Sequence, residues 1–293
     1  MDITTPMASP GDGRAMRYVR FRDRGGYVRS GEWTDDGILA ADELHDVDAV
    51  DVLPPCEPTK LVCVGENYAT HVEETGEDSV NEIPDRPLLF LKPPNAVAGH
   101  GDTITLPTPG VSGEELAEYS SGAIERGQGR IDHEGEVGVV IGRQCRHVSA
   151  DAVDDVIAGY TCVNDVSNRD DQGIERNWVR GKAFDGAAPM GPVVATPEHV
   201  PDNPRIRLWV NGEKRQDSAG DHQVYTVPEV IADVTKFLTL EPGDVICMGT
   251  TAGVAPLRDG DTVRVEVEGV GTLEHGVRSP RPRGPDGTAD HPR

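Results

Sequence analysis

Two carboxylates stand two residues apart in the segment Asp132-His-Glu-Gly-Glu-Val-Gly-Val-Val-Ile-Gly142. If this segment is a strand, Glu134 and Glu136 project from the same face, because alternate side chains of a strand share a face. Two neighbouring anions repel each other unless a cation joins them. In so acidic a chain a Glu-x-Glu pair alone is usually an ordinary solvent-exposed face, so a metal site needs further ligands.

Further polar groups follow the apolar segment Tyr160-Thr-Cys-Val-Asn164. Asp165 comes directly after it, and Ser167, Arg169, Asp170 and Gln172 come soon afterwards. Polar groups crowded at the end of a buried strand more often serve a site than a core. Glu134, Glu136 and Asp165 would together supply hard oxygen ligands for Mg²⁺ or Mn²⁺ and leave positions for water and a chelating substrate.

A histidine near the start of this region has a carboxylate at helical spacing. His71 and Glu74 lie three residues apart, so on a helical turn they share a face and the carboxylate can orient the imidazole as a general base. A lone histidine is more often inert. Beside a metal site, a histidine with such a carboxylate is predicted to be catalytic.

Lys182 and a glycine-rich turn complete the candidate residues. Lys182 is one of only five lysines in a chain that otherwise uses arginine, which indicates that an ammonium group is needed there. The turn Gly249-Thr-Thr-Ala-Gly253 follows an apolar strand, and the amide of Gly249 and the hydroxyl of Thr250 could hold a substrate carboxylate. A plain tight turn is the alternative that stays open.

The elements that must position these residues are mainly strands. From Lys60 onward, short apolar runs separated by glycine and proline are typical of a β domain rather than of a repeating βαβ array. Asn211-Gly212 predicts a two-residue hairpin. Strands are predicted at 60–64, 88–92, 103–106, 135–142, 158–164, 205–210, 244–249 and 262–267, and helices at 68–74, 149–156 and 227–238, the last opened by Pro228.

The length of 293 residues fits one catalytic domain over residues 60–278 and a small N-terminal subdomain with a linker over 16–59. Residues 1–15 and 279–293 are expected to be disordered tails, the latter because of its proline, glycine and charge content. Residues 109–130 are rich in Gly, Ser and Glu. They are expected to form a long loop that is either disordered or a mobile lid.

The composition excludes several classes of function. The chain has 51 acidic and 28 basic residues, and its net charge of −23 argues against a nucleic-acid partner. No apolar run approaches the roughly 20 residues of a membrane span and no signal peptide is recognisable, so we expect a cytoplasmic protein. The acidic, lysine-poor composition resembles that of proteins from salt-loving cytoplasms. Five cysteines without a CxxC pair disfavour disulfides and thiolate-bound zinc.

Taken in order, these motifs resemble the catalytic domain of the fumarylacetoacetate hydrolase superfamily over roughly residues 60–277. Two departures concern substrate recognition. The turn at 249–255 reads Gly-Thr-Thr-Ala-Gly-Val-Ala where the family usually has Gly-Thr-Pro-Ala-Gly-Val-Gly, and the insertion at about 109–130 is longer than in most relatives. The matching segments are Asn67-Tyr68 with His71, Leu89-Phe-Leu-Lys-Pro-Pro94, the Glu-x-Glu strand, Asn164-Asp165 with Arg169 and Gln172, Lys182, Pro189-Met-Gly-Pro192 and Leu240-Glu-Pro-Gly-Asp244.

The resemblance implies a mixed α+β fold, a β-roll with few short helices, that is usually paired as a homodimer. It also implies a metal held by Glu134, Glu136 and Asp165, a His71–Glu74 dyad on a lid that orders with substrate, and substrate contacts from Asn67, Tyr68, Arg169 and Gln172 beside the catalytic Lys182.

The expected reaction is metal-dependent hydrolysis of a carbon–carbon bond in an acylpyruvate-like 1,3-diketo acid, a small 2-oxo acid. Isomerisation of the 2-hydroxyhepta-2,4-diene-1,7-dioate type and decarboxylation of a 2-oxo diacid such as oxaloacetate are alternatives that use the same metal site. A non-catalytic metal-binding domain is the alternative of another class.

Overall fold

Two neighbouring strands at the centre of the molecule carry the acidic motifs. In the computed structural model, which describes residues 15–68, 85–107, 130–219 and 223–280, β11 (Gly135–Ile141) pairs antiparallel with β12 (Ile157–Asn164). Every residue of β11 is buried, and in β12 only Tyr160 is partly exposed. Such continuous apolar burial is typical of strands that are covered on both faces.

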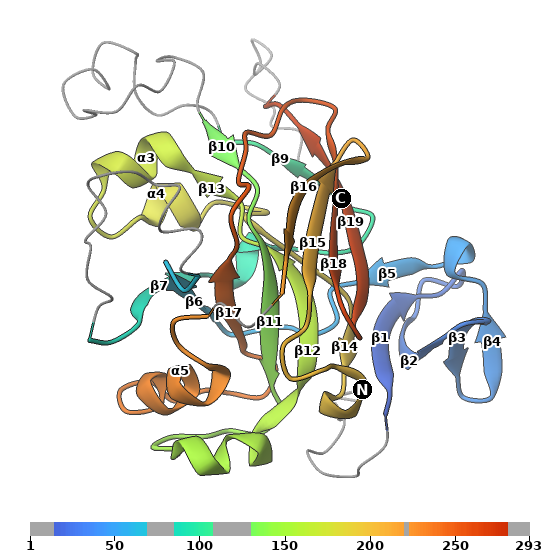
Figure 1. Cartoon of the computed structure of the whole chain (residues 1–293). Helices are drawn as coiled ribbons and strands as arrows, with labels where there is room; N and C mark the ends of the chain where they lie inside the picture. The colour runs from blue at the N-terminus through green and yellow to red at the C-terminus, as the bar shows by residue number, and fades with distance from the viewer. Residues whose placement is uncertain (1–14, 69–84, 108–129, 220–222, 281–293) are drawn as a thin grey trace.

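These strands lie in a main sheet of 12 strands with the order β4-β3-β2-β1-β14-β12-β11-β17-β6-β7, in which β5 pairs with β1 and β8 with β14 (Figure 1). The strands of the expected N-terminal subdomain therefore continue the central sheet through the β1–β14 pair. The remaining strands of this sheet are β1 (Arg17–Arg22), β2 (Val28–Thr34), β3 (Gly37–Ala40), β4 (Glu43–His45), β5 (Asp51–Leu53), β6 (Leu61–Gly65), β7 (Leu88–Lys92), β8 (Val97–Ala98), β14 (Ala188–Ala195) and β17 (Val245–Thr250).

A second sheet of five strands packs against the first, and buried side chains such as Val137 and Cys162 from the main sheet and Leu208, Val265 and Leu273 from the second form a shared core. Its order is β16 (Glu213–Ser218), β15 (Ile206–Val210), β18 (Thr262–Val267), β19 (Gly271–Arg278) and β9 (Thr103–Thr105). A short pair of strands, β10 (Ile131–Asp132) and β13 (Ser167–Asn168), flanks the acidic motifs.

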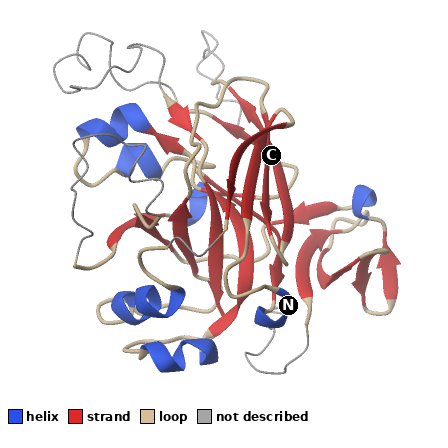
Figure 2. Ribbon diagram, viewed as in Figure 1, coloured by secondary structure: helices blue, strands red, loops and turns tan. Residues whose placement is uncertain are grey.

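The described helices are short and lie around the strands (Figure 2). They are α3 (Arg169–Ile174), α4 (Val179–Lys182) and α5 (Val227–Val234), with 3₁₀ helices η1 (Val47–Ala49), η2 (Pro94–Ala96), η3 (Ala150–Asp155) and η4 (Pro197–His199). Helix α5 begins with a capping box formed by Thr226 and Glu229. Within the described ranges, no helix has the length and apolar character needed to cross a membrane.

The predicted fold class, a mainly β mixed fold, is confirmed. The predicted strands at 88–92 and 262–267 coincide with β7 and β18. The predicted hairpin is also present, because Asn211 and Gly212, with φ of 52° and 80°, join β15 to β16.

Two predicted helices need correction. The helix predicted at 227–238 ends at Val234, because the amides of Lys236 and Phe237 donate to carbonyls three residues earlier and tighten the last turn. Residues 150–155 form a 3₁₀ helix instead of an α-helix, with three-residue hydrogen bonds at both ends. Apart from their end residues, the helix predicted at 68–74, both predicted tails and the loop at 109–130 lie outside the described residues.

Candidate metal centre and active site

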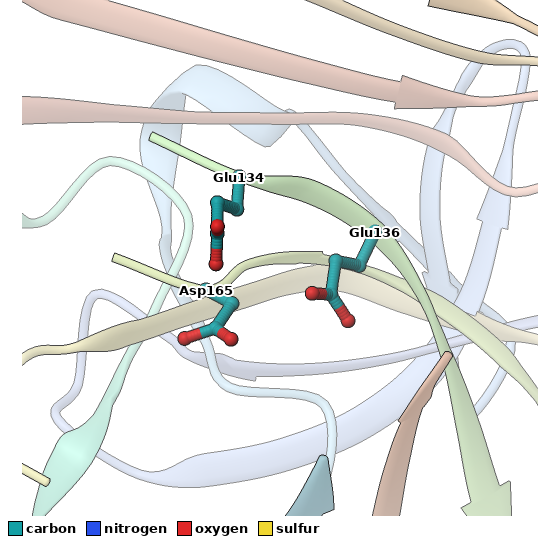
Figure 3. A group of neighbouring side chains, drawn as sticks. All are labelled: Glu134, Glu136 and Asp165. Atoms are coloured by element: carbon teal, nitrogen blue, oxygen red, sulfur yellow. The ribbon is translucent and has the colours of Figure 1, made fainter. Parts of the chain in front are cut away.

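The three predicted metal ligands come together at the end of the β11–β12 pair. Because Gly135 pairs with Asn164, the next residues outward, Glu134 and Asp165, are neighbours, and the Asp165 amide donates to the Glu134 carbonyl at 2.8 Å. The side chains of Glu134, Glu136 and Asp165 converge (Figure 3), and one carboxylate oxygen from each lies within 4.8 Å of the others. All three residues are buried.

One oxygen of Asp165 lacks a hydrogen-bond donor among the described residues. Asp165 Oδ1 is buried and lies 2.7 Å from the Lys92 ammonium. However, Lys92 directs its donors at the carbonyls of Val166, Lys182 and Ala187, at 2.7–3.2 Å. An ammonium has three N–H donors, so Lys92 supplies charge to Asp165 while the lone pairs of Oδ1 stay available to a metal ion.

Glu136 is short of positive charge. Its Oε2 accepts a hydrogen bond from the amide of Gly249 at 2.9 Å. Burial, together with the charges of Asp165, Cys63 and Glu134, raises the pKa of Glu136 well above its usual range, and Lys182 offsets only part of this effect. The cluster supplies three hard carboxylate oxygens, one of its oxygens lacks a hydrogen-bond donor among the described residues, and its negative charge is not fully balanced. These properties fit Mg²⁺ or Mn²⁺.

Lys182 joins two of these carboxylates from the end of α4. Its ammonium donates to Glu134 Oε2 at 2.6 Å and to Asp165 Oδ2 at 2.8 Å, and lies 4.7 Å from the centre of the Phe90 ring. Burial disfavours the charged form, but the charges of Asp165 and Glu134 outweigh it and raise the pKa of Lys182. Two of its three donors are thus engaged, and among the described residues the third has no acceptor, which leaves it for a substrate oxygen.

Arg169 opens α3 and is engaged with the protein itself. Its three nitrogens donate to Asp132 Oδ2 at 2.9 Å, to Gln172 Oε1 at 2.9 Å and to a carboxylate oxygen of Glu134. Burial opposes the charged form of Arg169, but the charges of Glu134 and Asp132 raise its pKa. In this conformation Arg169, which also binds Gln172, orients Glu134, and the predicted role of Arg169 and Gln172 as substrate contacts stays a prediction.

Asn67 and Tyr68 are also predicted to contact substrate, and this role stays a prediction; in the structure Asn67 lies beside Gly249. The amide group of Asn67 donates to the carbonyls of Met248 and Tyr225 and accepts from the Tyr225 amide, so it holds two chain segments together. Tyr68 is buried and accepts a hydrogen bond from Gln223, and burial raises the pKa of Tyr68 to about 12.

The predicted turn residues Gly249 and Thr250 form the end of β17 and touch the site through the backbone. Gly249 has a φ of 88°, and a methyl group on it would lie 2.9 Å from Cβ of Asn67. Glycine is therefore required where the Gly249 amide approaches Glu136. The Thr250 hydroxyl donates to the carbonyl of Gly135 at 2.9 Å, so it braces β11.

The structure leaves the predicted dyad untested and adds residues that sequence reasoning missed. His71 and Glu74 lie outside the described residues. Lys92 had a visible signal, since it is another of the five lysines in this arginine-rich chain. Asp132 anchors Arg169 and had no signal beyond its place in the acidic motif. Nor did Gln216, which accepts from the Gly135 amide at 2.9 Å and donates to Thr250.

Comparisons with known proteins identify relatives of this chain. The family described as "Fumarylacetoacetate (FAA) hydrolase C-terminal" matches residues 60–278. The oxaloacetate tautomerase YisK of Bacillus subtilis is 34% identical over 76% of this chain and 71% of its own length. The crystal structure of 2-hydroxyhepta-2,4-diene-1,7-dioate isomerase from Mycobacterium marinum is 32% identical, with a TM-score of 0.73, over 90% of this chain and 98% of its own.

A third relative was solved with a metal. Fumarylpyruvate hydrolase from Pseudomonas aeruginosa, in complex with Mn²⁺ and pyruvate, is 29% identical with a TM-score of 0.63, over 78% of this chain and 92% of its own. The named relatives are enzymes that catalyse hydrolysis, isomerisation or tautomerisation. With the family match spanning the whole candidate site, this chain belongs to the fumarylacetoacetate hydrolase family.

Proposed function

We propose that this chain hydrolyses a carbon–carbon bond in an acylpyruvate-like 1,3-diketo acid in the presence of Mg²⁺ or Mn²⁺. The observation that carries the proposal is the buried cluster of Glu134, Glu136 and Asp165 with the Lys182 ammonium between two of its members. A cation-binding carboxylate cluster and a fixed ammonium, side by side, suit a substrate whose carbon skeleton acquires negative charge during the reaction.

In this proposal Glu134, Glu136 and Asp165 hold a divalent cation, which supplies Lewis-acid polarisation of the 2-oxo acid end of the substrate. His71, oriented by Glu74, takes a proton from water, and the water oxygen forms a bond to the distal carbonyl carbon. The third N–H of Lys182 donates to the oxygen that becomes negative.

The bond between the distal carbonyl carbon and the methylene then breaks. The electron pair of this bond passes to the methylene carbon, so the 2-oxo acid fragment leaves as an enolate. The enolate then takes up a proton. The products are a carboxylic acid and pyruvate or a related 2-oxo acid, so one water is consumed for each bond broken.

A second candidate is isomerisation, tautomerisation or decarboxylation of a 2-oxo or 2-hydroxy-unsaturated diacid. It is favoured by the names of two relatives, the oxaloacetate tautomerase and the dienedioate isomerase. Decarboxylation needs only groups that the described residues contain, namely the carboxylate cluster and Lys182, whereas hydrolysis further requires a base for water and isomerisation or tautomerisation requires a base for a C–H proton. The predicted homodimer and cytoplasmic location accompany either candidate as expectations from the sequence.

The first test is a panel of acylpyruvates, oxaloacetate and unsaturated hydroxy-diacids, assayed with Mg²⁺ or Mn²⁺ in high salt with product identification. Hydrolysis predicts release of a 2-oxo acid and a carboxylic acid that stops when the metal is chelated. Release of carbon dioxide or a rearranged product supports the second candidate. A His71→Ala variant separates the two further, because full activity on the best substrate would count against water activation by His71.

A further inference from the structure

Beside the Lys182 ammonium lies a pair of aromatic rings to which the mechanism above assigns no role. The Phe90 ring centre lies 4.7 Å from Lys182 Nζ. The ring of Trp178 meets that of Phe90 in a T-shaped contact, with centres 5.6 Å apart. A methyl group placed on Gly65 would lie 3.6 Å from the Trp178 ring, so this ring also covers the end of β6. Both aromatic residues are only half-buried.

The backbone of Trp178 is strained to hold this ring in place. Trp178 is the residue before α4 and has a left-handed conformation, with φ 55° and ψ 23°. Bulky residues rarely adopt this conformation, and glycine or asparagine would adopt it more easily. Its carbonyl accepts a hydrogen bond from the amide of Lys182 at 2.8 Å, so the strained residue and the reactive ammonium belong to one turn. Because backbone strain beside a site often accompanies a functional side chain, the conformation of Trp178 points to a function for its ring.

We propose that Phe90 and Trp178 form a wall that binds the distal end of the substrate, and that this end is a planar, uncharged group such as an aryl or conjugated alkenyl group. This inference rests on the proposed function, because it takes the 2-oxo acid end to be held at the carboxylate cluster. The distal carbonyl oxygen reaches the third donor of Lys182, and the group attached to that carbonyl lies along the rings.

The chemistry of the wall selects against a charged distal group. The faces of aromatic rings are electronegative, so they attract planar carbon groups and cations and repel a carboxylate. Arg180, the other cation of α4, binds Glu175 at the surface, and the one remaining donor of Lys182 is used by the distal carbonyl oxygen. A second carboxylate on the substrate would therefore gain nothing from this turn.

The test measures binding without any reaction. Two 2-oxo acids without a distal carbonyl, 2-oxo-4-phenylbutanoate and 2-oxopentanoate, share their acid end and differ only in the group that would meet the rings. Their dissociation constants are measured by calorimetry with Mn²⁺ for the wild type and for Trp178→Gly. Glycine tolerates the left-handed conformation, so this variant removes the ring without adding strain.

We expect the wild type to prefer the phenyl ligand and Trp178→Gly to reduce that preference roughly five- to tenfold, with 2-oxopentanoate affinity changed less than about twofold. Phe90→Leu should shift the preference in the same direction. Trp209→Gly serves as the matched control, since Trp209 packs under Arg264 in the second sheet, and should leave the preference unchanged.

Two results would overturn the wall. One is a wild type that does not prefer the phenyl ligand. The other is a Trp178→Gly variant that keeps this preference, or whose affinity for both ligands falls equally, because the ring would then have a purely structural role. Failure of the proposed function looks different, because then Mn²⁺ binds but neither 2-oxo acid binds to any variant. That result would overturn the wall as well, since the wall rests on this function.

Discussion

At the scale of single residues, the site separates the groups that attract a cation from the group that faces the substrate. A divalent cation would stabilise the ionised form of Glu136, whose pKa is raised. It would also bind the oxygen of Asp165 that lacks a hydrogen-bond donor among the described residues. Lys182 is held by two carboxylates with one donor to spare. The cation site and the reactive ammonium therefore share ligands, yet their contributions can be separated by substitution.

Replacing Lys182 by methionine should lower kcat by roughly 10²–10³-fold, because a fixed donor to a developing negative charge is lost. Metal affinity should not fall, since Glu134 and Asp165 lose a competing cation and remain in place. Kd for Mn²⁺ by calorimetry and kcat at saturating metal check the two statements separately. Lys60→Met is the control, because Lys60 pairs with Asp244 away from the carboxylate cluster. A parallel loss of metal affinity and kcat in Lys182→Met would contradict this separation.

At the scale of elements, the site is assembled where several chain segments end. Glu134 precedes β11, Asp165 follows β12, Lys182 ends α4, and Lys92 at the end of β7 binds carbonyls from three of the neighbouring segments. Lys92 is fully buried, so it fastens the residues after β12, the end of α4 and the start of β14 to one another.

Lys92→Met should therefore lower the free energy of unfolding by about 3 kcal/mol or more, because three buried carbonyls lose their donor at roughly 1 kcal/mol or more each. Lys236→Met should cost at most about 1 kcal/mol, since the Lys236 side chain is 70% exposed and pairs with Asp233 at the surface. Urea unfolding of both variants without added metal measures the difference. Equal losses of unfolding free energy in the two variants would mean that Lys92 does not hold these segments together.

The sequence predicted elements well where pattern alone decides, as in β7 and β18, and it predicted the three carboxylates because β11 and β12 are continuous apolar runs. It missed β14, whose segment Ala-Pro-Met-Gly-Pro-Val-Val-Ala contains Pro189, Gly191 and Pro192, residues that ordinarily argue against a central strand. Helices α3 and α4 were missed because such short helices depend on tertiary contacts rather than on propensity.

At the scale of the whole molecule, charge is the property that the sequence states most directly. The 28 basic and 51 acidic residues leave a net charge of −23. Some ion pairs of the described surface are well exposed, such as that of Arg264 with Glu274, whose side chains are 46% and 51% exposed, and pairs of this kind contribute little to stability. The excess negative charge is therefore opposed chiefly by dissolved ions, which makes folding stability depend on the solvent.

The free energy of unfolding should rise with KCl between 0.05 and about 1 M, where the screening length shrinks from more than 10 Å to about 3 Å. Beyond that concentration the gain from screening should level off, since like charges on the surface no longer interact. Sucrose is the control, because it stabilises compact states by exclusion without screening charge. Repeating the KCl series near pH 4 should give a smaller rise, as protonation of surface carboxylates removes the repulsion itself. A stability that is flat in KCl at pH 7, or a rise of equal size at both pH values, would show that self-repulsion does not limit this fold.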